Sequence, residues 1–354
     1  MKTINFLPLL LSISLLGQAP MPIEKAKDLI LSIEDSIHYS VPKLDRLCDH
    51  IKLKKSTIDI GDCKLYIERE GKGKPMVLIN GGPGGTHHYF HPWFSNLKDQ
   101  FELIYYDQRG TGRSDFSPGV GYSFQQAVED LEKLRISLNI DKWTLCGYSY
   151  GGALAQLYTA QYPENVSSLI LISSLPLFQH VDFDGDQNKY ISEIEKNKLN
   201  EIIKLYVKGE LDMPSFLYNL SLNGDWRRQY YYKPKKEESI RSALYEWVND
   251  KDFNSIMSES VSKVDTDSIF INCPIPTLIF EGADDLTWGT KKTEIFRKEH
   301  PRAEFVLLNE CGHQVFQDRT TDFFSKVIEF NSSIQASDKE SILKWKNQIS
   351  INPK

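Results

Sequence analysis

The sequence has few cysteines, no excess of positive charge and no apolar run long enough for an ordinary membrane span. Its five cysteines are an odd number without a regular spacing, so a disulfide scaffold is not expected. The formal net charge of −6 leaves only scattered lysines to offset phosphate repulsion, which argues against a nucleic-acid partner. With 354 residues, 40% of them hydrophobic, the chain can still bury one large core and an inserted subdomain.

An apolar run, Phe6 to Leu16, lies at the N-terminus and is too short to span a membrane as a helix. It follows a charged start and precedes the small residues Gly17 and Ala19, which is typical of a secretory signal peptide. We therefore expect residues 1–20 to be cleaved and the protein to be exported, periplasmic or secreted, with no transmembrane segment in the mature chain. The alternative is an apolar helix packed on the domain.

The segment Gly147–Gly152 carries the strongest chemical signal. The apolar run Trp143–Cys146 enters it, and a helix of small residues, Ala153–Tyr162, leaves it. A serine on such a sharp turn from strand to helix is lifted clear of the sheet, and glycines on both sides remove side chains that would clash. Ser149 is therefore the predicted nucleophile.

A serine nucleophile needs a base and a carboxylate that orients the base. Downstream, the apolar strand Thr277–Glu281 is followed by Asp284 and Asp285, and a second strand, Phe305–Leu308, by His313. Each residue alone could be a polar turn or a surface histidine. Together, at successive strand ends, they give the order Ser, Asp, His of the α/β-hydrolases.

The oxyanion of such a reaction needs backbone donors. The apolar strand Met76–Ile79 runs into the glycine-rich segment Asn80–Gly85, where backbone N–H groups can approach a reacting carbonyl. We predict that the amides of Gly82 and Tyr150 form the oxyanion hole.

Two motifs resemble the proline iminopeptidase-type branch of the α/β-hydrolases. Tyr106–Ser114 is similar to its Asp-Gln-Arg-Gly-x-Gly-x-Ser signature, and Asn80–Gly84 is similar to its His-Gly-Gly-Pro-Gly loop, with asparagine in place of histidine. The resemblance covers roughly residues 56–175 and 268–331. It implies an α/β-hydrolase fold, with a mostly parallel central sheet, helices on both faces and an inserted helical cap.

The resemblance also suggests roles for individual residues. Related hydrolases show Gly-x-x-Asp after the strand that corresponds to Thr277–Glu281, which favours Asp285 over Asp284 as the carboxylate of the triad, and Asp284 remains the alternative. Arg109 and Asp107 are expected to form a buried ion pair that braces the oxyanion loop.

The chain departs from the narrower proline-specific enzymes in two places. The nucleophile motif reads Gly-Tyr-Ser-Tyr-Gly-Gly instead of Gly-Gly-Ser-Trp-Gly, and the cap has only Tyr245-Glu246-Trp247 where those enzymes have Trp-x-x-Trp-Glu. The glutamates that capture the substrate's free amine in the family are therefore not carried over to this sequence.

Changes in composition and in the expected secondary structure divide the sequence into segments. After the signal we expect an N-terminal helical extension over 21–55, with its helix around Ile23–Ile37, and a polar C-terminal tail over 335–354. The hydrolase core spans 56–175 and 268–334. Between its two parts, 176–267 lacks alternating strands and helices and is predicted to be a helical cap. The aromatic residues of the cap could line the acyl pocket or fill the core of the cap itself, and we favour a role in the cap core. These residues are Trp226, Tyr230, Tyr231, Tyr232, Tyr245 and Trp247.

The cap contains a segment, 184–195, that resembles an EF-hand calcium loop. Its defect is Lys189, which stands where a glycine normally makes the sharp turn. Ser192 and Glu195 would also form a helix capping box, so the alternative is a solvated acidic loop. A bound Ca²⁺ would be structural, and no cofactor is expected for catalysis. The predicted calcium ligands are Asp184, Asp186, Asn188, the Tyr190 carbonyl and Glu195.

Three functions are consistent with the sequence. The first is a serine aminopeptidase of the proline iminopeptidase type that releases N-terminal residues from short peptides. The second uses the same groups on small molecules, as a carboxylesterase, lactonase or amidase. The third is a non-catalytic ligand-binding relative of the hydrolases. The presence or absence of an anionic pocket for a free amine in the cap distinguishes the first from the second.

Overall fold

The computed structural model describes residues 36–117, 121–175, 177, 185–186, 188–264, 268–287, 289–335 and 337–349. The expected signal peptide, most of the expected helix around Ile23–Ile37, and Asp184 lie outside the described residues. Within the described part of the chain, no helix has both the length and the apolar character needed to cross a membrane.

The strands of the described residues form one eight-stranded sheet in the order β1-β2-β4-β3-β5-β6-β7-β8. The hairpin β1–β2 and the pair β2–β4 are antiparallel, and all other neighbours are parallel. This confirms the mostly parallel sheet. The strands are β1 Lys54–Asp59, β2 Lys64–Gly71, β3 Lys74–Ile79, β4 Phe101–Tyr106, β5 Trp143–Tyr148, β6 Val166–Ile172, β7 Thr277–Gly282 and β8 Glu304–Leu308.

Successive side chains of a strand point to opposite faces of the sheet, and here both faces are buried. In β3, Val77 and Ile79 enter one hydrophobic cluster while Met76 and Leu78 enter the other. The first face is covered by α2 Phe124–Ser137, α3 Tyr150–Gln161, α8 Thr290–Glu299 and α11 Lys339–Gln348. The second is covered by η3 His87–Phe90, η4 Trp93–Leu97, α9 Val315–Asp318 and α10 Thr320–Ser333. The short turns η5 Pro163–Asn165 and η8 Ile269–Asn272 precede β6 and β7. The predicted helices on both faces are therefore confirmed.

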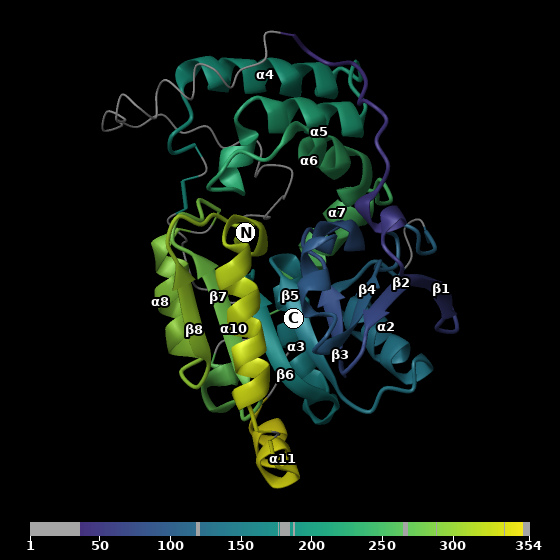
Figure 1. The fold of residues 1–354 in the computed structure, drawn as a ribbon, viewed down its shortest axis with the longest axis vertical. Helices are drawn as coiled ribbons and strands as arrows, with labels where there is room; N and C mark the ends of the chain where they lie inside the picture. The colour runs from purple at the N-terminus through teal and green to yellow at the C-terminus, as the bar shows by residue number, and fades with distance from the viewer. Residues whose placement is uncertain are drawn as a thin grey trace.

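The segment between β6 and β7 forms the cap, and Figure 1 shows its helices α4, α5 and α6 stacked beyond one end of the sheet. Its hydrophobic side chains make clusters of their own, one of them around Leu199, Ile202 and Phe216. Among the described side chains, none of the six singled-out cap aromatics belongs to these clusters, and Trp247 packs against the core cluster of the second sheet face instead. The cap elements are α4 Glu193–Val207, α5 Met213–Leu222, η6 Asp225–Arg228, α6 Lys236–Arg241, the π-helical turn η7 Ser242–Glu246 and α7 Phe253–Val261.

Residues 36–50, which we call the strap, run from the cap to the edge of the sheet (Figure 1). The described part of the expected helical extension is not α-helical, and its one helical turn is η2, Leu47–His50. The backbone of His38 exchanges two hydrogen bonds with the side chain of Asn219, at 2.9 and 2.7 Å. The Leu44 carbonyl accepts a hydrogen bond from the Tyr245 hydroxyl. These contacts tie the strap to α5 and to the end of η7.

The C-terminal segment 335–354 is not simply a polar tail, because it contains α11. Asp338 caps this helix by accepting a hydrogen bond from the amide of Ser341, at 2.8 Å. Ile342 and Trp345 are buried, and the Trp345 indole donates to the Ile269 carbonyl at 2.9 Å. A single apolar stripe was enough to fix this otherwise polar helix to the domain.

Candidate active site

Ser149 lies between β5 and α3 with φ 52° and ψ −119°, the strained backbone expected for a nucleophile on a sharp turn. Its amide donates to the Ile172 carbonyl at 2.9 Å, which anchors the turn to β6. A side chain at Gly147 would overlap the Gly151 carbonyl, and one at Gly151 would overlap the Ile79 carbonyl. The close packing of strand, turn and helix therefore requires the glycines of this motif.

Asp285 and His313 are brought together by the turns that follow β7 and β8. Asp285 Oδ2 lies 2.7 Å from His313 Nδ1, and Asp285 Oδ1 accepts the Thr287 amide at 2.9 Å. Both side chains are buried. Asp284, the alternative, is half-buried and makes no hydrogen bond to His313 within the described residues. The geometry is that of a carboxylate that orients a catalytic imidazole.

The charge state of Asp285 follows from its surroundings. Burial alone would raise the pKa of this carboxyl, but the charge of His313 and its hydrogen bond outweigh burial and lower the pKa to about 2. Lys292 adds to this effect from 3.9 Å and pairs with the buried Glu281 at 2.6 Å. Neither Lys292 nor Glu281 belongs to a recognisable motif, so neither could be assigned to the site from the sequence.

Ser149 and His313 come from different strand ends, and within the described residues no hydrogen bond joins their side chains. The Tyr148 ring, next to the serine, lies 5.2 Å from the His313 ring between centroids. Contacts between nucleophile and base are often long in the absence of substrate. The three predicted triad residues thus occupy one end of the sheet, with the Asp–His pair already formed.

The predicted oxyanion donors lie on either side of the nucleophile. Tyr150 is the first residue of α3, so its amide has no partner within the helix. The Gly81–Gly85 loop folds back on itself, with the Gly85 amide donating to the Gly81 carbonyl at 3.2 Å. A side chain at Gly81 would reach 3.4 Å from the Ser149 Cβ, which places this loop, and Gly82 within it, against the nucleophile.

Arg109 and Asp107 do not form the expected ion pair. Arg109 binds Asp130 with two nitrogens at 2.8 Å and also pairs with Asp62 at 2.9 Å. Asp107 instead accepts from the amide and the imidazole of His87, at 2.9 and 2.7 Å. The expected ion pair was wrong, because the partner of Arg109 is Asp130 on α2, a residue outside the local motif that the sequence alone did not indicate. Asp107 does hold the chain directly after the oxyanion loop.

A segment of the cap, residues 245–250, lies across the oxyanion loop. The Thr86 amide donates to the Glu246 carbonyl at 3.0 Å, and the Asn249 side chain donates to the Gly84 carbonyl at 3.0 Å. The Trp247 ring packs against Tyr89 with centroids 5.9 Å apart. These residues therefore belong to the site rather than to the interior of the cap.

The Glu246 carboxylate is held within this segment. One oxygen accepts the Ser242 hydroxyl at 2.6 Å, and the other lies 3.9 Å from His88 Nδ1. Among the described residues no lysine or arginine pairs with it. Burial raises the pKa of Tyr148 well above its usual range, and the negative charges of Asp285 and Glu246 add to that rise, so both carboxylates act on the tyrosine next to the nucleophile.

The predicted calcium loop has a different local geometry from an EF-hand where it is described. The left-handed backbone falls on Tyr190, with φ 73°, and not on Lys189. Glu195 forms the capping box with Ser192, and its other oxygen pairs with Arg227 at 3.0 Å. Both carboxylate oxygens of Glu195 therefore have protein partners. Asp186 and Asn188 form a turn in which the Asn188 amide donates to the Asp186 side chain at 3.0 Å.

The strand order, the elbow at Ser149 and the Asp–His pair agree with one family of proteins. The sequence model of the family described as "alpha/beta hydrolase fold" matches residues 74–320. The chain belongs to the α/β-hydrolase family. It is a hydrolase of this family, and the predicted fold class is confirmed.

Relatives and solved structures within the family differ in chemistry. The chain is 26% identical to a proline iminopeptidase of Saccharolobus solfataricus, over 75% of this chain and 87% of the relative. It is 25% identical to a cis-3-alkyl-4-alkyloxetan-2-one decarboxylase of Shewanella oneidensis, over 75% of this chain and 85% of the relative. Its fold is similar to that of the 2-hydroxy-6-oxo-6-phenylhexa-2,4-dienoate hydrolase of Rhodococcus, with a TM-score of 0.61, 19% identity, and coverage of 80% and 99% of the two chains.

Proposed function

We propose that the protein is a serine hydrolase of the proline iminopeptidase type, which releases the N-terminal residue from short peptides. The observation that carries this proposal is the Glu246 carboxylate, buried between Ser242 and His88 in the cap segment that lies across the oxyanion loop. Relatives named proline iminopeptidase, at 26% to 27% identity, support it.

In the proposed reaction Ser149 attacks the carbonyl carbon of the first peptide bond. His313 takes the serine proton through Nε2 and later gives it to the leaving amine, while Asp285 holds Nδ1–H and stabilises the imidazolium. The amides of Gly82 and Tyr150 bind the oxyanion. Water then repeats the attack on the acyl-enzyme, with His313 again acting as base.

Glu246 gives this site a preference for a free amine. An aminopeptidase must bind a positively charged α-amino group beside the bond that it cleaves. A carboxylate without a cationic partner among the described residues offers a charge-assisted hydrogen bond to such a group. The departure from the Trp-x-x-Trp-Glu motif is compatible with the proposal, because Tyr245-Glu246-Trp247 supplies a glutamate in the segment that lies across the oxyanion loop.

The test compares amino-acid arylamides, their N-acetylated forms and aryl esters without an amine. Replacing Glu246 by Gln keeps the size and the hydrogen bond from Ser242 but removes the charge. We expect KM for the free arylamide to rise about 10- to 100-fold, since a hydrogen bond to a charged group contributes roughly 1.5–3 kcal/mol. Turnover of the ester should change less than about twofold. The exposed cap residue Glu237, changed to Gln, is the matched control.

Two results would contradict the proposal. Equal loss on amine and ester substrates would make Glu246 a structural residue, and faster cleavage of esters than of any arylamide would favour the carboxylesterase, lactonase or amidase alternative. Failure of Ser149 to react with a fluorophosphonate probe would favour the non-catalytic ligand-binding alternative. The protein is further proposed to be exported, on the strength of its N-terminal sequence.

A further inference from the structure

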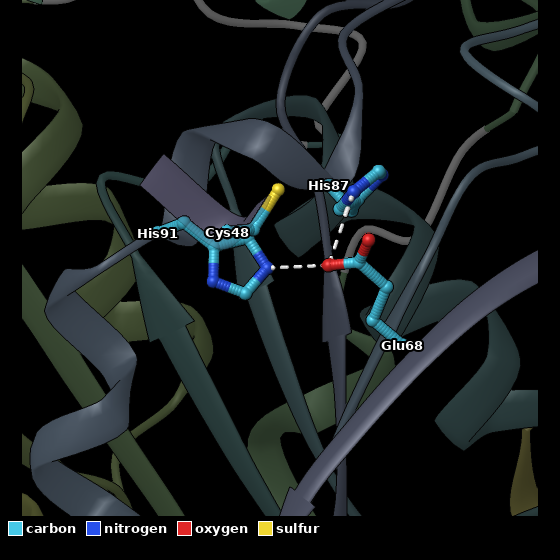
Figure 2. A group of neighbouring side chains, drawn as sticks. All are labelled: Cys48, Glu68, His87 and His91. Carbon is cyan, nitrogen blue, oxygen red and sulfur yellow. Dashed lines mark ion pairs between the residues drawn. The ribbon is translucent and has the colours of Figure 1, made fainter. Parts of the chain in front are cut away.

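Four side chains from separate parts of the chain meet beneath the oxyanion loop. They are Cys48 from the strap, Glu68 from β2, and His87 and His91 at the two ends of η3. Figure 2 shows the sulfur, the carboxylate and the two imidazoles surrounding one point. One ligand atom from each lies within 4.8 Å of the other three, and all four residues are buried.

The cluster leaves several buried polar atoms without a hydrogen-bond partner. Among them are Glu68 Oε2, His87 Nε2 and His91 Nε2. The carboxylate oxygen lies 3.1 Å from His91 Nε2 and 3.5 Å from His87 Nε2. One carboxylate oxygen therefore faces two imidazole nitrogens without a good hydrogen bond to either, an arrangement of buried polar atoms that a shared cation would satisfy better.

The groups around the cluster orient its members as metal ligands. His87 Nδ1 lies 2.7 Å from Asp107 Oδ1, which leaves Nε2 free to bind a metal. Such a carboxylate behind a histidine is the usual support of a zinc ligand. Glu68 Oε1 accepts the Tyr66 hydroxyl at 2.7 Å, and the His91 ring stacks on Tyr105 with centroids 4.1 Å apart. The remaining atoms therefore point inward.

We propose that Cys48, Glu68, His87 and His91 bind one zinc ion. Thiolate, imidazole and carboxylate together suit Zn²⁺, whereas Ca²⁺ and Mg²⁺ prefer oxygen ligands alone. In a tetrahedral zinc site, with bonds of about 2.0–2.3 Å, ligand atoms lie roughly 3.3–3.8 Å apart. The two distances from Glu68 Oε2 to the imidazole nitrogens, 3.1 and 3.5 Å, are close to this range, and all four ligand atoms lie within 4.8 Å of one another. A Cys48 thiolate and the Glu68 carboxylate would offset the charge of the ion, beside Arg46, which lies 3.7 Å from the other oxygen of Glu68.

Four protein ligands complete the coordination of zinc, so the site is structural and supplies no water to the reaction. The ion joins three segments that are distant in sequence: the strap, the edge of the sheet at β2 and the chain that follows the oxyanion loop. It would fix the strap, and with it the cap, to the core of the hydrolase. This role is separate from the proposed chemistry at Ser149.

The test is metal binding by the full chain. Purified protein should bind one equivalent of zinc, and its cobalt derivative should show the charge-transfer band of a thiolate ligand and the spectrum of a tetrahedral site. Removing the metal with a chelator should lower Tm by roughly 5–10 °C, and zinc should restore it. Replacing Asp107 by Asn should weaken zinc binding about 10- to 100-fold.

The variant Cys48→Ser should lose the thiolate band, while the matched control Cys63→Ser, at another buried cysteine of the same region, should keep it. A wild-type chain that takes up neither zinc nor cobalt would overturn the proposal, as would a cobalt complex without the thiolate band. These wild-type measurements decide the question even if Cys48→Ser does not fold.

Discussion

Replacing Asp285 by Asn should nearly abolish catalysis without unfolding the protein. In the structure Oδ1 of Asp285 accepts the Thr287 amide at 2.9 Å, and Oδ2 faces His313 Nδ1 at 2.7 Å. An asparagine would keep its carbonyl oxygen on Thr287 and would therefore turn its NH₂ group toward His313. The imidazole would then have to accept at Nδ1 and carry its proton on Nε2, where it cannot act as a base.

In a comparable triad the wrong tautomer costs about 10⁴-fold in kcat. That factor corresponds to about 5.5 kcal/mol of transition-state stabilisation. The assay is steady-state kinetics of the purified variants on the best arylamide or ester substrate, with thermal melts to verify folding. Asp284→Asn is the matched control, because Asp284 is adjacent in sequence but makes no hydrogen bond to His313 within the described residues, and its kcat should stay within about twofold. An Asp285→Asn enzyme with more than a tenth of wild-type kcat, or a reversed order of the two variants, would refute the assignment.

Ser149→Ala should abolish turnover and leave the melt almost unchanged, since alanine fits the turn; a purified variant with a tenth of wild-type kcat would contradict the triad. The pKa of Asp285 lies at about 2 in the fold, below its usual 3.8, so its ionised form adds about 2 kcal/mol of stability above pH 4. This contribution should disappear as the pH falls toward 2, and denaturant melts of wild type and Asp285→Asn should converge over that range. If the 184–195 loop binds calcium, millimolar Ca²⁺ should raise Tm by several degrees over chelator and Glu195→Gln should remove the rise; an unchanged wild-type melt would leave Glu195 as a helix cap and partner of Arg227. N-terminal sequencing of protein from the native host should show that at least residues 1–16 are absent, and retention of Met1 would refute export by a cleaved signal.

The triad could be located from the sequence because each of its members follows an apolar strand. In parallel sheets of this kind the carboxyl ends of the strands meet at one edge, so residues far apart in sequence converge without any contact information. The pairing of Asp285 with His313 agrees with that reasoning. The position of Glu246 could not be reached in the same way, because it depends on how the cap packs on the oxyanion loop.

The proposed zinc ligands Cys48, Glu68, His87 and His91 show a second limit of prediction from sequence. Its members stand in three segments whose pairing depends on the docking of the strap, and only the four-residue spacing of His87 and His91 hinted at a shared site. The helix α11 was missed for a different reason. Its signals, the cap at Asp338 and the apolar pair Ile342 and Trp345, are present in the sequence but are diluted by charged neighbours.

The strap also constrains the order in which the protein can assemble. It is the first described part of the chain to be synthesised, yet His38 must wait for Asn219, 181 residues later, and Leu44 for Tyr245, 201 residues later. Contacts of such long range form late, because the entropy of closing the loop must be overcome before they contribute. The partners of Cys48 appear much earlier in synthesis. An ion bound by Cys48 and these partners would hold the strap on the nascent core while the rest of the chain is synthesised. The strap would then be in place to contact the cap once the cap has folded.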